Sequence, residues 1–504
     1  MVENILSAFA LLLDPIVFVA AIGGLVAGIM VGALPGLTAT MAVAVLSPFT
    51  FFMDTMVGLP FLLGTYKGAI YGGSIPAILI NTPGTAAAAA TAADGNAMAR
   101  AGKARLALQI SLVASIIADL LATLVLIAVA APLAAIAIRF GAPEFALLYV
   151  IALTLIAAVS GEDTIKGLIA ATIGIAISLI GLDPMSGYQR FTFGSVQLMA
   201  GISLVPLLIG MFAISEIIVN AEESISGRRK GDAIDPNQGP RLTLARLKRL
   251  MPTILRSTGI GTGLGSLPGL GAEISCWISW GVAKRRSKNP EQFGRGSEEG
   301  VAAAEAGNNA VCPAALIPML VFGIPGDTVT AVLLGAFMAQ GLMPGPLLFT
   351  RDPVILYALF AFLLVSNVLL LMLGFAAIRY LQRIIQIPNG LLYPVVTVFC
   401  FAGAYAVNNN IYDIVVMMAG GIAGYVMRKI SMPIPPLIIG LLLAPGLERS
   451  LRQSLVMSNG SLDIFVTRPG ALTLVVLFAG FIAFLVWRTV RPYTQSTVTG
   501  ETTS

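Results

Sequence analysis

The stretch from Tyr66 to Gly84, YKGAIYGGSIPAILINTPG, constrains the fold of this chain more than any other. It is apolar and long enough to reach across a bilayer, yet it contains a lysine, four glycines and two prolines. Unpaired backbone is costly in lipid, so such breaks at membrane depth line a cavity or pack against protein. A related stretch, NNAVCPAALIPMLVFGIPGD, runs from Asn308 to Asp327. Two broken segments in corresponding positions indicate a binding site for a transported solute.

The composition indicates a membrane protein. Of 504 residues, 57% are hydrophobic and only 11% are charged, whereas a soluble chain has roughly 25% charged residues. We therefore predict an all-α polytopic membrane protein with an inverted-topology repeat and re-entrant or broken helices. The chain has no histidine, which excludes histidine proton relays, histidine metal sites and catalysis by Ser-His or Cys-His pairs. No cofactor and no nucleic-acid partner are expected, because the basic residues lie in loops between apolar segments.

The order of apolar and polar segments divides the chain. A glycine ladder at Gly24, Gly28 and Gly32 permits close helix packing, and Gly261, Gly265 and Gly269 repeat it. Helices are expected at about 105–131, 143–160, 164–182 and 194–219, and five more apolar segments follow residue 353. The basic stretch LTLARLKRLMP could form an amphipathic surface helix. The predicted units are a first repeat at 1–105, membrane helices at 106–219, a cytoplasmic basic connector at 220–256, a second repeat at 257–350, C-terminal membrane helices at 351–488 and a cytoplasmic tail at 489–504.

The flanking charges predict that the two repeats have opposite orientations. Basic loops stand on both sides of the first apolar pair of the second repeat, whereas the same pair of the first repeat has none. After the second break the bias reverses, with Arg100, Lys103 and Arg105 closing the first repeat. Because cytoplasmic loops are enriched in Lys and Arg, we predict a periplasmic N-terminus and a cytoplasmic C-terminus. Arg449 and Arg452 are exceptions, since they fall in a loop placed outside.

Two Leu-Pro-Gly tripeptides are expected at the tips of helix breaks, one in each repeat. Residues 257–283 leave the cytoplasm and return to it, and they are too few for two spans of about 20 residues each. A re-entrant or shallow hairpin fits them better, with its tip at the second tripeptide. The predicted tip residues are Leu34, Pro35, Gly36, Leu267, Pro268 and Gly269.

At these residues the chain resembles the large membrane subunit of tripartite tricarboxylate transporters, the TctA type. The matching stretches are GALPGLTA, YGGSIPAILINTPG and DGNAMARAG in the first repeat, and GSLPGLGA, FGRGSEEGVAAAEAGNNA, FGIPGDTVTAVLLGA and GLMPGPLLF in the second. Ala304 and Gly307 depart from the usual pattern beside Glu305. The resemblance implies a bacterial inner-membrane importer of tricarboxylates, dicarboxylates or related organic acids, driven by an ion gradient. It implies two partners, a periplasmic solute-binding protein and a small membrane subunit.

An anionic substrate needs a cation or N–H donors, because removing water from a carboxylate without replacement is prohibitive. Broken helices supply such donors at the N-termini of their half-helices. The predicted substrate-binding residues are Lys67, Ser74, Asn81, Thr82, Gly84, Thr85, Pro325, Gly326, Asp327 and Thr328. Lys67 either contacts a substrate carboxylate or forms a structural salt bridge to Glu305 or Asp94, and for Ser74 we favour satisfying freed backbone over binding substrate.

The coupling ion is either sodium or a proton. Neutral hydroxyl and amide oxygens suit a hard cation such as sodium, and either Glu305 or Asp327 could instead carry a proton. The predicted ion-coupling residues are Asn81, Thr82, Glu305, Asn308, Asn309 and Asp327. Asp119 lies in the middle of an apolar segment outside the repeats, where pairing between helices is the expected role.

Two other classes of protein compete with a carrier. Gly326-Asp327 and Tyr412-Asp413 resemble, poorly, the two aspartate motifs of an intramembrane protease, with the motif order reversed. A passive organic-anion channel is the second alternative, because inverted repeats also occur in channels. If the protein is a carrier, alternating access is expected, with the two broken hairpins moving together against the helices at 105–219 and 353–487. The identity of the acid, the stoichiometry of the ion and the oligomeric state do not follow from the sequence.

Overall fold

The structure, a computed structural model, describes residues 10–11, 14–159, 163–183, 185–225, 234–385, 389–480 and 483. Within these residues the protein is all-α, apart from one two-stranded ladder of two residues per strand. Seven helices are long and apolar enough to cross a membrane, and five shorter apolar helices of 10–17 residues accompany them. The fold class predicted from the sequence is confirmed. The predicted tail at 489–504 and part of the basic connector, 226–233, lie outside the described residues.

The first repeat is a helix bundle in which glycines allow two helices to pack closely. Its helices are α2 Pro15–Gly32, α3 Ala39–Thr50, α4 Thr55–Gly72, α5 Ser74–Ile80, the 3₁₀ turn η1 Ala86–Ala88 and α6 Ala89–Met98. The ladder on α2 packs directly on the backbone of α4. A Cβ atom placed on Gly24, Gly28 or Gly32 would lie 2.0 to 2.3 Å from a carbonyl oxygen of α4. Only glycine permits this approach, so the ladder fixes the distance between the two helices.

The second repeat copies this order of helices. It consists of α12 Leu244–Gly265, α13 Gly271–Arg286, η5 Pro290–Gln292, α14 Glu298–Asn309, α15 Val311–Phe322 and α16 Thr328–Ala339. The two breaks have the same local geometry. Asn81 ends α5 and Gly323 ends α15, both in the left-handed conformation with φ of 56° and 69°. The next N–H, of Thr82 or Ile324, donates to the carbonyl of the proline five residues before the cap, at 3.3 and 3.2 Å.

Two predicted boundaries differ from the structure. The stretch LTLARLKRLMP is not a separate surface helix, because α12 runs without interruption from Leu244 to Gly265 and crosses the boundary predicted at residue 256. Its hairpin with α13 turns at Leu267-Pro268-Gly269, as predicted. The helix expected at 194–219 begins only at Leu204, since a 3₁₀ turn at residues 197–200, preceded by short strands at 181–182 and 189–190, is separate from it.

The remaining elements surround the repeats. A long central helix, α7, passes beside α14 and α15 of the second repeat and α5 and α6 of the first. The elements are the π-helical turn η2 Ala99–Lys103, α7 Ala104–Ala137, α8 Ala142–Val159, α9 Thr164–Ser178, β1 Gly181–Leu182, β2 Gln189–Arg190, η3 Gln197–Ala200, α10 Leu204–Leu208, the π-helical turn η4 Ile209–Ile214, α11 Ser215–Ile225, α17 Leu348–Arg351, α18 Pro353–Ile385, α19 Asn389–Asn408, α20 Ile411–Lys429, α21 Ile434–Met457 and α22 Ile464–Thr467.

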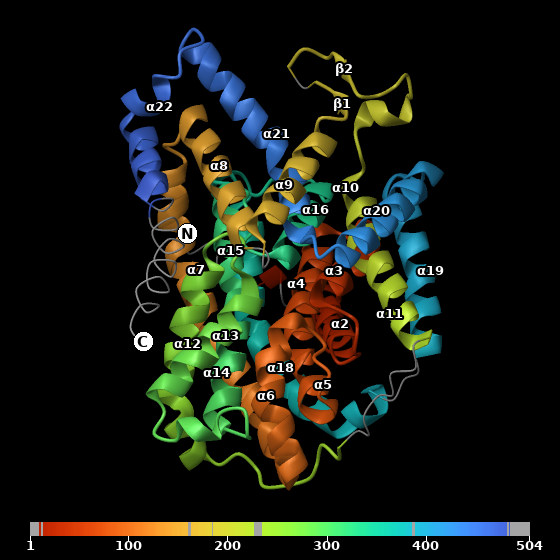
Figure 1. The fold of residues 1–504 in the computed structure, drawn as a ribbon, viewed down its shortest axis with the longest axis vertical. Coiled ribbons are helices and arrows are strands. Elements are labelled where there is room, and N and C mark those ends of the chain that lie inside the picture. Colours follow the sequence, from red (N-terminus) through yellow and green to blue (C-terminus); the bar gives the residue numbers. More distant parts are fainter. Residues whose placement is uncertain are drawn as a thin grey trace, which may run out of the picture.

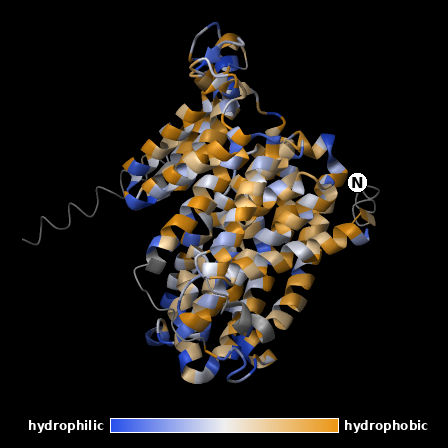
Figure 2. Cartoon of the chain, turned by 90° about the vertical axis from the view of Figure 1, so that its right-hand side faces the viewer, coloured by the Kyte–Doolittle hydropathy of each residue, from blue (hydrophilic) through white to orange (hydrophobic). Residues whose placement is uncertain are grey.

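The polar segments gather at two opposite ends of the molecule. The β1–β2 ladder and the end of α21 lie at one end, whereas the basic segments 99–105 and 284–297 lie at the other (Figure 1). Hydrophilic residues are concentrated at both ends in the hydropathy view (Figure 2). These two basic segments therefore lie at the same end of the molecule.

An ion-pair cluster at the upper end accounts for one of the two exceptional arginines. Arg452 binds Asp183 at 2.9 Å and Glu448 at 2.7 Å. Arg190 of β2 binds the same two acids. The Arg452 guanidinium is therefore paired with two acids at this end of the molecule. The backbone N–H of Met185 and then the Arg190 guanidinium hold the pKa of Asp183 below its usual range.

We expect Asp183→Asn to loosen the β1–β2 hairpin and to leave the helices intact. Because the pKa of Asp183 is lowered, its contribution is present above the ordinary aspartate pKa and is lost only as the pH falls through the lower, folded value. The anchor should therefore hold at neutral pH in the native protein. Amide hydrogen exchange across residues 185–195 should speed up in this variant and not in Asp463→Asn, an exposed control. Unchanged exchange rates would show that the ladder alone holds the hairpin.

Candidate functional site

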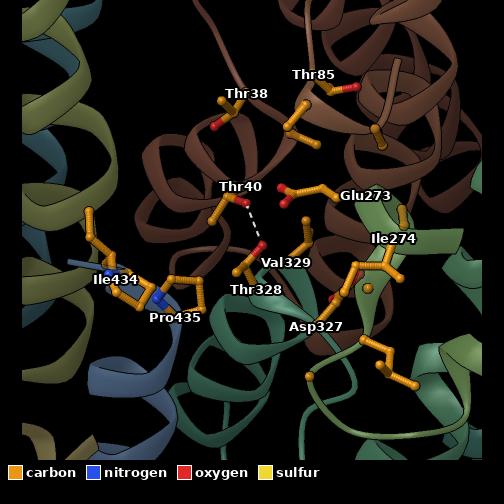
Figure 3. Close-up of a pocket in the computed structure, with 18 of the residues that line it drawn as sticks. Thr38, Thr40, Thr85, Glu273, Ile274, Asp327, Thr328, Val329, Ile434 and Pro435 are labelled. Carbon is orange, nitrogen blue, oxygen red and sulfur yellow. Dashed lines mark hydrogen bonds between the residues drawn. The ribbon is translucent and has the colours of Figure 1, made fainter. Parts of the chain in front are cut away.

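A cavity of about 960 Å³ lies where the two repeats meet. Its wall is built from the starts of helices: the residues before and within the first turns of α3, α13, η1 and α16 all line it, and so does the start of α21. Figure 3 shows Thr40 and Glu273 directed toward the same space from opposite sides. The first N–H groups of a helix have no partner within the helix. The cavity wall therefore includes several helix starts that carry such donors, and the side chains of Thr38 and Asp327 cap two of them.

The cavity wall repeats the internal symmetry of the chain. Thr38–Thr40 follow the first Leu-Pro-Gly turn at the same spacing at which Gly271–Glu273 follow the second. Thr85–Ala87 and Asp327–Val329 likewise hold equivalent positions after the two breaks. The two repeats also touch directly here, because the hydroxyls of Thr40 and Thr328 lie 3.0 Å apart. Each repeat thus supplies one turn and one break to a shared site.

The charged side chains of the cavity differ in how they are bound. Asp327 caps α16, accepting the N–H and the hydroxyl of Thr330 at 2.7 Å each, and it also accepts the hydroxyl of Tyr66 at 2.7 Å. Arg428 is the one basic residue among the described residues lining the cavity, and it binds Glu216 at 2.6 Å. Glu273 stands in the first turn of α13. An incoming anion would therefore rely on helix N-termini and hydroxyls more than on a dedicated cation.

The predicted substrate residues are only partly brought together. Thr85, Asp327 and Thr328 line the cavity. Asn81 and Thr82 are exposed and lie outside its lining. The other three break residues, Gly84, Pro325 and Gly326, are buried and do not line it. A Cβ on Gly84 would lie 2.1 Å from a backbone oxygen of α2, so its role in this structure is close packing.

Sequence reasoning did not predict most residues of the cavity, among them three polar ones near the Leu-Pro-Gly turns. Thr38, Thr40 and Glu273 line it, and none was among the predicted substrate or ion residues. Their signal was present, because each follows a Leu-Pro-Gly turn that was itself predicted. The Leu-Pro-Gly tripeptides were expected only as tips of helix breaks, whereas in the structure the helices that follow them, α3 and α13, begin at the cavity wall.

Lys67 pairs with an internal acid. Its ammonium group lies 2.8 Å from Asp119 of α7, and both side chains are buried, at 1% and 2% exposure. It also donates to the hydroxyl of Ser366 at 2.7 Å and to the carbonyl of Leu363 at 3.0 Å. The salt bridge proposed as the alternative to a substrate contact is present, but the partner is not Glu305 or Asp94. Asp119 pairs between helices, as expected.

Asp94 instead joins the two repeats. Its carboxylate accepts the N–H groups of Gly294, Gly296 and Ser297 and the indole N–H of Trp280. These four donors come from α13 and from the loop that leads into α14, whereas Asp94 stands on α6. Four hydrogen bonds from the second repeat therefore satisfy one buried carboxylate of the first.

One face of α7 carries a line of buried polar residues. Ser111, Ser115, Asp119 and Thr123 follow one another at intervals of four, which places them on a single face of the helix. Ser111 meets the hydroxyl of Ser74 at 2.8 Å, and Ser74 also donates to the carbonyl of Tyr71. The four-residue spacing is present in the sequence. It is easily overlooked, because these few polar residues are spread through a long apolar segment. The stripe connects α7 to both repeats.

Glu305 lies on α14 beside this stripe. It is fully buried, with 0% exposure. It accepts hydrogen bonds from the hydroxyl of Thr91, the hydroxyl of Ser115 at 3.0 Å and the amide of Asn309 at 3.5 Å. The neighbouring Asn308 is also fully buried, and neither of its side-chain polar atoms has a hydrogen-bond partner among the described residues. Two of the predicted ion residues, Glu305 and Asn309, are thus in direct contact.

Comparison with known proteins identifies the family to which this chain is related. The family model described as "Tripartite tricarboxylate transporter TctA family" matches residues 18–439. The chain belongs to the TctA family. A relative in Agrobacterium vitis, an uncharacterized 52.8 kDa protein in the TAR-I ttuC' 3' region, is 35% identical over 97% of each chain. A second protein of that organism, from the TAR-II ttuC' 3' region, is 38% identical over 43% of this chain and 90% of its own length. A search of solved structures finds no match.

Membership of the TctA family settles the class of the protein. The matched residues include both repeats and the cavity between them. The family is a transporter component and not an enzyme, so the weak resemblance to an intramembrane protease is wrong. A tripartite system contains a binding protein and a small subunit besides this one, and the apolar helices place this subunit in a lipid bilayer.

Proposed function

We propose that this TctA-family subunit imports dicarboxylates, tricarboxylates or related organic acids through the bacterial inner membrane. The observation that carries the proposal is the cavity at the junction of the repeats, where the starts of α3, α13, η1 and α16 converge. Helix N-termini bind carboxylates through their free N–H groups and the positive end of the helix dipole. Several such termini suit a substrate with more than one carboxylate.

The solute-binding protein would deliver the acid at the periplasmic face, and alternating access would carry it inward. A sodium or proton gradient supplies the driving force in this proposal. The N-terminus is then periplasmic and the C-terminus cytoplasmic, which puts the hairpin of β1 and β2 on the side where the binding protein arrives. The cavity contains two carboxylates, Glu273 and Asp327, so a bound cation would also reduce repulsion of the anion there.

Uptake into proteoliposomes tests this function. Vesicles containing both membrane subunits are supplied with a panel of radiolabelled di- and tricarboxylates and the cognate binding protein outside, under a sodium or a proton gradient. Concentrative uptake under one gradient alone is expected. Flux that only follows the substrate gradient, and that ignores both ions and the binding protein, would identify a passive channel instead.

Within the same assay, Thr40→Val should raise the half-saturating substrate concentration about tenfold. The variant keeps the shape of the side chain and removes the hydroxyl that reaches Thr328, and a hydrogen bond to a charged group contributes about 1.5–3 kcal/mol. Thr154→Val is the matched control, because Thr154 is on α8 outside the cavity and donates only to a backbone carbonyl among the described contacts. Equal half-saturation in both variants would remove Thr40 from the substrate site.

A further inference from the structure

The two repeats present equivalent positions to α7, and these positions are filled differently. Lys67 on α4 and Asn309 on α14 correspond under the internal repeat that pairs residues 59–83 with 301–325. Lys67 contacts Asp119, whereas Asn309 contacts Ser115 at 2.8 Å, one turn earlier on the same face of α7. Each repeat thus places one polar residue against the α7 stripe, close to one buried carboxylate.

Beside the first repeat, the carboxylate of Asp119 on α7 has a cation that belongs to the protein, Lys67. The ammonium group of Lys67 is surrounded by oxygens, from Asp119 at 2.8 Å, Ser366 at 2.7 Å and the carbonyl of Leu363 at 3.0 Å. A charged acid and a charged base satisfy each other here. The Lys67–Asp119 pair is therefore neutral overall without a bound ion from solution.

In the second repeat, the carboxylate beside Asn309 is that of Glu305 on the same helix, and it has only neutral neighbours. The groups that contact Glu305 are two hydroxyls and an amide, from Thr91, Ser115 and Asn309. No described lysine or arginine forms an ion pair with it. The titratable groups that face it from the packed helices are Tyr71 on α4 and Cys276 on α13, and both are uncharged near neutral pH. A buried carboxylate without a cation is too costly to remain ionised.

Asn308 adds a second observation at the same place. It stands three residues after Glu305 on α14, so both side chains lie on one side of the helix. Its amide oxygen and nitrogen are buried and have no partner among the described residues. Carboxylate, hydroxyl and amide oxygens are also the ligands that a hard monovalent cation prefers.

We propose that Glu305, with the hydroxyls of Thr91 and Ser115 bound to it and Asn308 three residues further along α14, is the binding site of the monovalent cation that drives transport. The cation is a proton on the carboxylate or a sodium ion held by it, and in either case it supplies the charge that Lys67 supplies to Asp119. The proposal rests on the proposed function, since it concerns the coupling of a carrier. It places the coupling ion outside the substrate cavity, whose described lining does not include Glu305.

The test compares Glu305→Gln with the native protein in proteoliposomes that contain the membrane subunits. Two rates are measured: concentrative uptake under an imposed ion gradient, and exchange of labelled against unlabelled substrate at equal concentrations without a gradient. The ratio of driven uptake to exchange should fall at least tenfold in Glu305→Gln. Glu299→Gln is the matched control, with the same chemical change in the first turn of the same helix, and its ratio should equal that of the native protein. A native ratio in Glu305→Gln would overturn the proposal.

Milder variants identify the ion and guard against a misfolded Glu305→Gln. Thr91→Val and Ser115→Ala should raise the sodium concentration for half-maximal uptake severalfold if sodium binds. If a proton binds, they should shift the pH midpoint of uptake and leave sodium without effect. Neither shift in two folded variants would also overturn the proposal. If the native protein itself shows no gradient-driven uptake, the proposed function fails; if only the variants behave as native, the function stands and the site fails.

Discussion

Lys67→Met should destabilise the folded protein by about 3–5 kcal/mol, the cost of leaving one member of a buried ion pair alone. Methionine fills nearly the same volume and removes the charge, so Asp119 remains in the interior without its cation. The hydroxyl of Thr123, at 3.3 Å, is the other described donor to this carboxylate. Thermal unfolding in detergent measures the loss. A variant as stable as the native protein would contradict the assignment of Lys67 to this pair.

The double variant Lys67→Met/Asp119→Asn separates the structural role of Lys67 from a contact with substrate. Removing both charges should restore much of the stability, because no buried charge then remains unpaired. If Lys67 serves only the ion pair, the double variant should bind substrate with normal affinity. A large loss of affinity in a stable double variant would instead show that the lysine also reaches the substrate.

Gly28→Ala should destabilise the protein by about 3 kcal/mol, at the upper end of the usual cost of overpacking. The added Cβ would stand 2.3 Å from the carbonyl oxygen of Thr65 and 2.8 Å from the backbone nitrogen of Ala69. Both atoms belong to the backbone of α4, so no side-chain rotation relieves the clash and the helices must separate.

Gly263→Ala is the control for this substitution. Gly263 lies within α12 and has no atom within 4 Å of the position of a Cβ. Alanine favours helix over glycine by about 1 kcal/mol, so this variant should be as stable as the native protein or slightly more so. Equal unfolding temperatures for Gly28→Ala and Gly263→Ala would show that α2 and α4 are not held by the ladder.

The repeat and its breaks could be predicted because they depend on local chemistry. Both turns carry the same Leu-Pro-Gly tripeptide, whose glycine adopts a positive φ, so the turns at Leu34-Pro35-Gly36 and Leu267-Pro268-Gly269 were correctly placed. The start of the helix at Leu204 was not, because residues 194–203 contain no charged residue and run directly into the next apolar segment. The hairpin before them is anchored by ion pairs of Arg190 with Glu448 and of Asp183 with Arg452, which are far away in the sequence.

The candidate site was predictable in its chemistry and less so in its partners. A lone lysine in an apolar segment was expected to pair with an acid. Which acid it pairs with, Asp119, depends on how α7 packs against α4. Asn81 and Thr82 appeared suitable as ligands from their residue type. In the folded chain the break turns them away from the cavity, and the next residues, beginning at Thr85, face it.

The hydrogen bonds of Lys67 and Asp94 imply an order of events during synthesis. Asp119 lies on the first long helix after the first repeat, so the lysine can be neutralised soon after α7 is made. The hydrogen bonds of Asp94 form later, because its four donors lie between residues 280 and 297. Until the ribosome has delivered that segment, Asp94 lacks the four protein donors that it has in the folded chain. The hydrogen bonds between Asp94 and the second repeat can therefore form only after the second repeat has been synthesised.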